Sequence, residues 1–263
     1  MTKYLDQMRL KGKKAVITGG CGLIGRAAVD ALAQAGAKVV IADVNERAAQ
    51  TQVRLLSRKG YQVVFKKLDI TDIDELKNNI ASIVRNINGL DIWVNCAYPR
   101  TSDWGASPDK VTAESWRKNV DMQLNTYAMS SQYALEHMKK KGGSLINLGS
   151  IYGVTGGNMH IYEDTKVKPV PMIYTAVKGG IVNLGRFLAS YYGPYNIRVN
   201  TVCPAGVYIN HDPKFVRNYS RKVPLGRMAK PEEVASAILF LASPAASYIT
   251  GTAFMVDGGW TAL

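Results

Sequence analysis

Cysteine is scarce in this sequence. Among its 263 residues only Cys21, Cys96 and Cys203 are cysteines, and they lie far apart, each in or beside an apolar stretch. An odd number of widely spaced cysteines argues against a disulfide framework, and none of them has the spacing of a metal site. We therefore expect three reduced thiols and no bound metal.

Long apolar runs are also absent. A membrane-spanning helix needs about 18 consecutive apolar residues, and no segment reaches that length, although 47% of the chain is hydrophobic. The N-terminal segment, MTKYLDQMRLKGKK, lacks the apolar stretch of a secretory signal. The sequence therefore predicts a cytoplasmic protein with a sizeable buried core and no membrane partner.

Acidic residues are few relative to basic ones. The 20 Asp and Glu residues are outnumbered by 33 Lys and Arg, which gives a formal net charge of +13. Such a charge raises the question of nucleic acid or another anionic ligand. The basic residues are scattered, with concentrations at 139–141 and 214–230, and no nucleic-acid-binding motif accompanies them. We predict solvated basic faces and no nucleic-acid partner, but the cluster at 214–230 could hold a phosphate or carboxylate.

Strand-like apolar runs alternate with segments of helical periodicity along almost the whole chain. This pattern predicts an α/β fold, a Rossmann-type doubly wound parallel sheet of about seven strands with helices on both faces. No linker or repeat interrupts it, so we expect one domain over 1–263. The expected strands are 14–18, 38–42, 62–67, 90–95, 143–148, 197–202 and 253–256. The expected helices are about 24–36, 45–59, 72–87, 112–140, 173–193 and 231–242.

Two segments, 151–172 and 205–230, depart from the alternation, and a third irregular segment is expected at about 97–111. Each follows an expected strand, and ligands of open α/β sheets bind beyond the carboxyl ends of the strands. We therefore interpret these segments as substrate loops. They offer hydrogen-bond donors and flat aromatic faces with few large aliphatic groups. The candidate substrate-binding residues are Arg100, Trp104, Tyr152, Tyr162 and Tyr208.

A glycine turn connects the first expected strand to the first expected helix, in the segment TGGCGLIG at 18–25. Glycines there permit a tight turn and let backbone amides approach a pyrophosphate, while the helix N-terminus attracts the anion. This arrangement predicts a dinucleotide site. Its expected contacts are Gly19, Gly22, Leu23, Ile24 and Gly25.

Asp43 ends the second expected strand, where a carboxylate can accept hydrogen bonds from the ribose hydroxyls of adenosine. A 2'-phosphate would meet this carboxylate as a like charge, so NAD is favoured over NADP. Arg47 is near enough in sequence to keep NADP open, and Asp43 could instead be a helix N-cap. Asp69 follows the third strand and could face the adenine, or could simply end the strand in a turn.

Tyr174 and Lys178 are four positions apart in an expected helix, so their side chains leave the same face. An ammonium one turn away favours the phenolate and should move the tyrosine pKa towards neutrality. Ser150 follows the fifth strand and can donate a hydrogen bond to a developing alkoxide. Together the three residues predict general acid and base chemistry at a carbonyl or alcohol.

The chain resembles the short-chain dehydrogenase/reductase family almost from end to end. The segments that carry the resemblance are TGGCGLIG at 18–25, VNCA at 94–97, LGS at 148–150, YTAVK at 174–178, IRVNTVCPAG at 197–206, VPLGRM at 223–228 and YITGTAFMVDGG at 248–259. The resemblance implies hydride transfer between the nicotinamide and the carbon of a secondary alcohol or ketone. It also implies that Tyr174 is the general acid/base, that Lys178 binds the nicotinamide ribose, and that Ser150 positions the substrate carbonyl. Further cofactor contacts implied in this way are Asn95, Val202 and the segment that starts at Pro204, with Gly206 and Val207. Asp69, Ile70 and Ala97, which lie at or just after strand ends, are also expected cofactor contacts.

The resemblance also implies a homo-oligomer. Members commonly form tetramers or dimers by packing two long helices, here those expected at about 112–140 and 173–193. The C-terminal segment near Trp260 would dock in the same assembly. The sequence thus predicts a homotetramer or homodimer.

Three features depart from the common family pattern. Leu23 occupies a position that is usually glycine, with Gly22 taking that role, and Gln123 stands where an asparagine usually serves a proton relay, with Asn125 as the alternative. In addition, Ser150 and Tyr174 are separated by an unusually long loop. This loop contains His160, Tyr162, Glu163, Asp164 and Lys166. Together with AYPRTSDWG at 97–105, it resembles a bacterial branch associated with flagellin modification and nonulosonic acids, which implies a polar, carbohydrate-like substrate. A 3-oxoacyl or small-ketone reductase and a non-catalytic NAD-binding protein remain alternatives.

Overall fold

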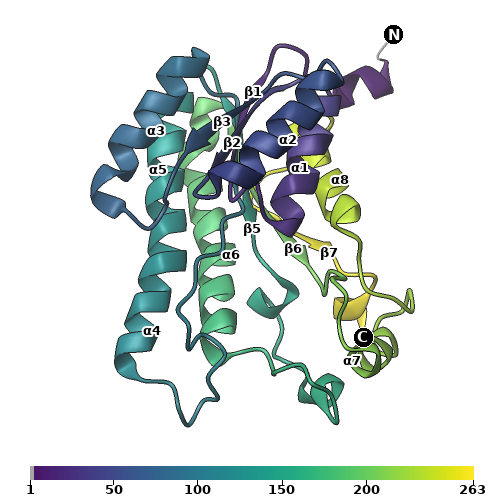
Figure 1. The fold of residues 1–263 in the computed structure, drawn as a ribbon. Coiled ribbons are helices and arrows are strands. Elements are labelled where there is room, and N and C mark those ends of the chain that lie inside the picture. Colours follow the sequence, from purple (N-terminus) through teal and green to yellow (C-terminus); the bar gives the residue numbers. More distant parts are fainter. Residues whose placement is uncertain (1–2) are drawn as a thin grey trace.

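The sheet of the computed structural model, which describes residues 3–263, has seven parallel strands in the order β3-β2-β1-β4-β5-β6-β7 (Figure 1). Most residues of the central strands are buried, as expected for a parallel sheet covered on both faces. The predicted single-domain, Rossmann-type sheet is confirmed. The strands are β1 (Lys14–Thr18), β2 (Lys38–Asp43), β3 (Val63–Lys67), β4 (Ile92–Asn95), β5 (Gly143–Leu148), β6 (Ile197–Pro204) and β7 (Ala253–Val256).

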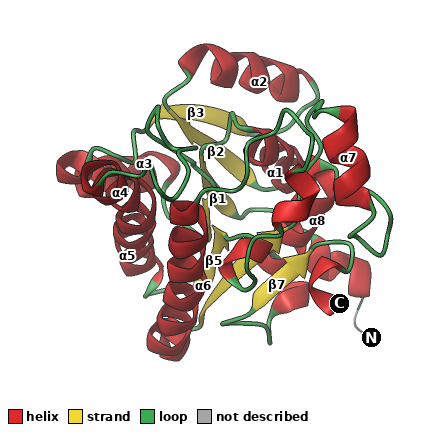
Figure 2. Cartoon of the chain, turned by 90° about the horizontal axis from the view of Figure 1, so that it is seen from below, coloured by secondary structure: helices red, strands yellow, loops and turns green. Residues whose placement is uncertain are grey.

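Helices cover the two faces of the sheet and enclose two apolar cores (Figure 2). Helices α1 and α8 pack over one face, and α3, α5 and α6 pack over the other. The eight helices are α1 (Leu23–Gln34), α2 (Glu46–Arg58), α3 (Ile73–Ile87), α4 (Ala113–Val120), α5 (Thr126–Met138), α6 (Met172–Tyr192), α7 (Pro213–Ser220) and α8 (Pro231–Ala242). None of the helices in residues 3–263 has the length and apolar character needed to cross a membrane.

The helix expected over 112–140 is interrupted, so this prediction was wrong in detail. Helix α4 ends at Val120, and a π-helical turn, Asp121–Asn125, connects it to α5. A π-helical turn inserts one extra residue and rotates the helix faces on either side of it. Here the turn directs Gln123 inwards, where only 2% of the residue is exposed.

The three segments predicted as substrate loops lie together beyond the carboxyl ends of the strands, at the lower end of the molecule in Figure 1. The segment 205–230 was expected to be irregular, but it contains α7. Asp212 is the N-cap of α7, and its carboxylate accepts from the amides of Lys214 (2.8 Å) and Phe215 (3.2 Å). Side chains of 151–172 and 205–230 share a separate apolar cluster, so the two segments cover each other. Its buried members are Ile151, Ile161, Phe215, Tyr219, Val223, Met228 and Trp260.

Candidate active site

Ser150, Tyr174 and Lys178 meet at the carboxyl end of β5. Helix α6 buries Ile173, Val177 and Lys178 against the molecule and places Tyr174 and Lys178 in its first two turns. The Lys178 ammonium donates to the carbonyl of Leu148, at the end of β5, over 2.6 Å. Ser150 follows β5, and its hydroxyl oxygen accepts from the Tyr152 amide (3.2 Å), which leaves its own proton free to be donated.

Burial is the largest cause of the pKa shifts of both Tyr174 and Lys178. It raises the pKa of Tyr174 above its usual value, with the Ser150 hydroxyl acting in the opposite direction. Burial also lowers the pKa of Lys178 to about 8. The Lys178 nitrogen lies 5.6 Å from the centre of the Tyr174 ring. The prediction that this ammonium moves the Tyr174 pKa towards neutrality was therefore wrong for the chain's own groups, because burial raises this pKa and the group that opposes the rise is the Ser150 hydroxyl.

Two tyrosines that sequence reasoning missed complete the surroundings of Lys178. Its nitrogen lies 5.6 Å from the ring centres of both Tyr98 and Tyr127, a distance typical of cation–π contact. Tyr127 comes from α5, and its hydroxyl donates to the carbonyl of Ala97 (3.1 Å). Tyr98 is the third residue after β4, and its place beyond a strand, at the ligand-binding edge of the sheet, was the available signal.

Three aromatic rings lie beside the Tyr174 side chain. Tyr98, Trp104 and Tyr152 lie 5.9, 6.1 and 6.4 Å from its ring centre, each nearly perpendicular to it. Tyr98 and Trp104 are also in edge contact with each other, at 5.5 Å. We call Tyr98, Trp104 and Tyr152 the aromatic wall. It brings two of the predicted substrate-binding residues, Trp104 and Tyr152, directly beside the predicted catalytic tyrosine.

The other two predicted substrate-binding tyrosines lie around α7. Tyr162 packs on Phe215, with ring centres 5.4 Å apart. Tyr208 is about half exposed, and its ring lies 6.2 Å from that of His211. Both lie in the segments 151–172 and 205–230, which cover each other. Within residues 3–263, neither makes a ring contact with Tyr174.

The amide of Gln123 is buried without a hydrogen-bond partner. Neither its oxygen nor its nitrogen is bonded within the described residues, although buried amides are nearly always satisfied. Asn125, the alternative relay residue, is exposed, and its amide donates to Asp121 (2.9 Å). A π-helical turn with an unsatisfied amide is typical of a functional position. Of the two candidates, Gln123 is therefore the one that can offer an amide inside the molecule.

Two positions of the glycine turn, Gly19 and Gly25, leave no room for a side chain. Gly19 has a φ of +64°, and a Cβ there would lie 2.5 Å from the Ala97 Cα. A Cβ on Gly25 would lie 2.1 Å from the Gly19 carbonyl oxygen. Helix α1 begins after Gly22 with no side-chain cap and no acidic residue in its first turn. Free amides at an uncapped helix N-terminus attract an anion, so this turn fits the pyrophosphate of a dinucleotide.

Asp43 is held at the end of β2 by two backbone amides. Its carboxylate accepts from Cys21 (2.9 Å) in the glycine turn and from Asn45 (2.9 Å) before α2. Asn45, not Asp43, is the N-cap of α2, so the alternative interpretation of Asp43 as a cap is wrong. The carboxylate is thus fixed beside the glycine turn. Asp69 accepts from both the amide and the hydroxyl of Thr71, in an exposed turn after β3.

Asn95 directs its side chain into the protein. Its amide oxygen accepts from the Trp93 indole (2.7 Å), and its nitrogen donates to Ser131 and Asn147, both at 2.9 Å. Only 1% of the residue is exposed. Asn95 therefore ties β4 to α5 and β5, and a cofactor contact at this position would involve the backbone.

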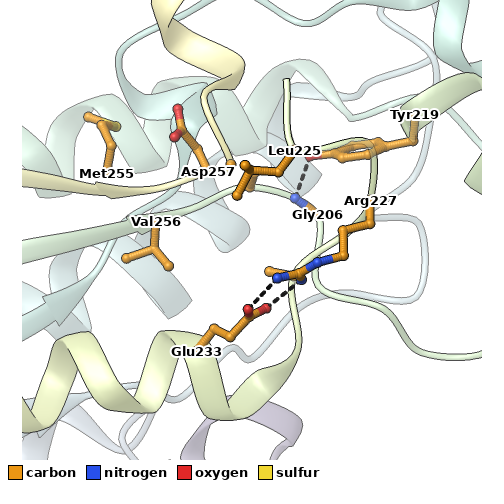
Figure 3. Close-up of a pocket in the computed structure, with 11 residues that line it drawn as sticks. Gly206, Tyr219, Leu225, Arg227, Glu233, Met255, Val256 and Asp257 are labelled. Carbon is orange, nitrogen blue, oxygen red and sulfur yellow. Dashed lines mark hydrogen bonds and ion pairs between the residues drawn. The ribbon is translucent and has the colours of Figure 1, made fainter. Parts of the chain in front are cut away.

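A cavity of about 240 Å³ lies beside the end of β6 (Figure 3). The Gly206 amide donates to the Tyr219 hydroxyl, which joins the turn after β6 to α7. Across the cavity, both guanidinium nitrogens of Arg227 bond the Glu233 carboxylate, at 2.6 and 2.8 Å. Lys214 pairs with Asp164 at 3.0 Å. Two cations of the basic cluster at 214–230 are thus neutralised by acidic residues of the chain.

Comparison with known proteins places this site in a family. A family model described as enoyl-(acyl carrier protein) reductase matches residues 22–261. The chain belongs to the short-chain dehydrogenase/reductase family. It is 35% identical to cis-4-hydroxycyclohexanecarboxylate dehydrogenase of Sinomonas cyclohexanicum, over 95% of this chain and 96% of that protein. It is 31% identical to a 3-oxoacyl-acyl-carrier-protein reductase of Thermotoga maritima, over 96% and 99% of the two chains.

Solved structures of this family superpose closely on the protein. A gluconate 5-dehydrogenase from Burkholderia cenocepacia, in complex with NADP and tartrate, has a TM-score of 0.88 at 26% identity and covers 99% of this chain and 100% of its own. A short-chain dehydrogenase from Leptospira borgpetersenii with bound NAD+ has a TM-score of 0.85 at 32% identity, with 99% and 97% coverage. The protein is an oxidoreductase that acts on alcohols or ketones with a nicotinamide cofactor.

Proposed function

We propose that the protein is an NAD-dependent oxidoreductase that interconverts a secondary alcohol and a ketone on a polar, carbohydrate-like ring. The observation that carries this proposal is the placement of Tyr174 between Ser150, Lys178 and the aromatic wall. Together they provide a proton donor and acceptor, a hydrogen-bond donor for the substrate oxygen, and flat surfaces around the reacting group. A non-catalytic nucleotide-binding protein would not need this combination.

Each member of the group has a distinct role. The Tyr174 hydroxyl passes a proton to the substrate oxygen in reduction and takes it back in oxidation. Ser150 donates a hydrogen bond to the same oxygen. Lys178 is held by its hydrogen bond to the Leu148 carbonyl and keeps a positive charge beside the Tyr174 ring. The nicotinamide, when bound, supplies or accepts the hydride. The buried Gln123 amide would hold a water that carries the proton onwards.

The cofactor would be held between the glycine turn and Asp43. The free amides at the start of α1 suit the pyrophosphate, and Pro204, Gly206 and Val207 after β6 remain expected contacts of the nicotinamide half. The Asp43 carboxylate beside the turn supports NAD over NADP, because a 2'-phosphate would be repelled. Arg47 is exposed at the start of α2 and is the residue that would favour NADP. Family structures bind either cofactor, one NADP and another NAD+.

The proposed substrate is supported by relatives and by the aromatic wall. A second relative, 2,5-dichloro-2,5-cyclohexadiene-1,4-diol dehydrogenase of Sphingobium indicum, is 32% identical over 96% of this chain and 98% of that protein. Its name, like that of the hydroxycyclohexanecarboxylate enzyme, gives a cyclic alcohol as the substrate. Three aromatic rings gathered beside Tyr174 suit a compact ring better than an extended acyl chain. The loop resemblance to the flagellin and nonulosonic acid branch, a cytoplasmic location and a homo-oligomeric state stay predictions.

Replacing Tyr174 tests the proposed chemistry. An activity screen with NAD against cyclic alcohols, sugars, sugar phosphates and nucleotide sugars should identify a substrate. Tyr174→Phe should then lower kcat by about 10²-fold or more, because the proton donor is lost, while NADH affinity measured by fluorescence persists. The matched control is Tyr248→Phe, at a fully exposed tyrosine. Wild-type turnover in Tyr174→Phe would refute the acid/base role, and tighter binding of NADPH than NADH would refute the cofactor assignment.

A further inference from the structure

Arg100 places a cation beside the aromatic wall. Its guanidinium carbon lies 5.4 Å from the centre of the Tyr98 ring, and that ring is in edge contact with Tyr174 at 5.9 Å. One aromatic ring therefore separates the guanidinium from the catalytic phenol. A guanidinium stacked on a ring keeps its N–H groups at its edges, where they can form a two-pronged contact with an acid.

The backbone on both sides of Arg100 is fixed. The carbonyl of Ala97 accepts from the Tyr127 hydroxyl on α5 (3.1 Å). Thr101 is bound to Asn119 of α4 twice, through its amide (3.2 Å) and its hydroxyl (2.8 Å), and Asn119 is 99% buried, with 1% exposed. Because the loop is ordered in advance, binding at Arg100 would cost little conformational entropy.

No acidic residue of the chain neutralises Arg100. Within residues 3–263, the ion pairs do not include it. Asp103, the acidic residue nearest in sequence, accepts instead from the Thr101 hydroxyl. By contrast, Arg227 and Lys214 in the opposite loop are paired with Glu233 and Asp164. In this loop, Arg100 is thus a cation that lies beside the aromatic wall and forms no ion pair within the described residues.

We propose that Arg100 binds a carboxylate carried by the substrate, so that the preferred substrate is a ring alcohol with an acid group. The inference rests on the proposed function, since it extends the same site. One fork of N–H donors with a single positive charge matches one carboxylate in geometry and charge. The aromatic wall would hold the ring while Arg100 sets which ring carbon faces Tyr174.

A pair of substrates that differ only in charge tests this inference. The probes are 4-hydroxycyclohexanecarboxylate and its primary amide, assayed with NAD on the full-length protein. We expect kcat/KM for the acid to exceed that for the amide by about tenfold or more. Arg100→Gln should bring this ratio close to one, mainly by raising KM for the acid, and Arg100→Lys should restore part of it. The matched control, Lys110→Gln in the same loop, should keep the wild-type ratio.

Two outcomes would overturn the inference and leave the proposed function intact. One is equal kcat/KM for acid and amide in the wild type, and the other is an unchanged ratio in Arg100→Gln. Oxidation of no cyclic alcohol at all would count against the proposed function instead. In that case calorimetric titration of cyclohexanecarboxylate into the protein with NADH decides the point. Binding that weakens tenfold or more in Arg100→Gln supports the inference, and equal or absent binding in both proteins rejects it.

Discussion

Lys178 shows how a single buried charge shapes this site. Only 5% of the residue is exposed, and its ammonium contacts one carbonyl and three tyrosine rings. These contacts do not fully replace water, so burial lowers its pKa from 10.5 to about 8. Near neutral pH the group is still mostly charged, and the folded protein bears the cost of that charge. The residue therefore serves the reaction at the expense of stability.

Replacing Lys178 by methionine should reveal this cost. Because the folded pKa lies below the unfolded one, the unfolded chain binds more protons between about pH 8 and 10.5, and wild-type stability rises across that window. Lys178→Met lacks this titration. The unfolding free energy of the variant minus that of the wild type should thus be larger at pH 7 than at pH 10, by roughly 2 kcal/mol. Urea unfolding at both pH values measures it, and a pH-independent difference would contradict the assignment.

At the scale of elements, the spacing of apolar residues predicted those strands and helices whose faces are buried. All seven strands and six helical segments were located from the sequence, since alternation of apolar runs reports which faces are covered. The π-helical turn at Asp121–Asn125 could not be found in this way, because the helices on both sides keep their own apolar spacing. Helix α7 had readable signals in Asp212, Pro213 and the buried pair Phe215 and Tyr219, but the mixture of turn formers, aromatic residues and charges along 205–230 suggested a loop.

The site residues that could be predicted are those whose position follows from the strand or helix in which they lie. Ser150, Tyr174 and the glycine turn each lie at a strand end or in a helix register that the sequence displays. The position of Tyr98 depends instead on how the loop after β4 packs against α6, which no local pattern encodes. The pKa of Tyr174 likewise depends on burial summed over several elements, and for this reason the prediction from its helical neighbour alone failed.

The turn that joins β1 to α1 should not tolerate a methyl group at Gly25. Its Cβ would lie 2.1 Å from the Gly19 carbonyl oxygen, and backbone cannot move aside without opening the turn. Gly25→Ala should weaken NADH binding at least tenfold and lower the melting temperature, as fluorescence titration and thermal melts would show. The control is Gly193→Ala, where a Cβ would meet nothing within 4 Å. NADH affinity equal to that of the wild type in Gly25→Ala would contradict this account of the turn.

At the scale of the whole molecule, the net charge and the exposed aromatic residues have opposite effects on association between copies of the chain. The net charge of +13 makes copies of the chain repel one another. Yet the outer face of α6 and the turn after it expose Phe187, Tyr191 and Tyr195 by 64%, 56% and 41%, and Phe187 stacks on Tyr191 with ring centres 6.2 Å apart. A contiguous aromatic patch of this kind marks an interaction surface. It supports the prediction of a homo-oligomer formed through this long helix.

The oligomer prediction is tested by a charge placed in the aromatic patch. Light scattering after size exclusion should give the wild type a mass that is a multiple of 28.7 kDa. Phe187→Lys should shift it towards 28.7 kDa, because a lysine in the contact would bury an unpaired charge next to other positive groups. Added salt should strengthen wild-type association, since it screens the net repulsion. The control is Leu55→Lys, at an exposed leucine on α2. A monomeric wild type, or an unchanged mass in Phe187→Lys, would exclude this face as the contact.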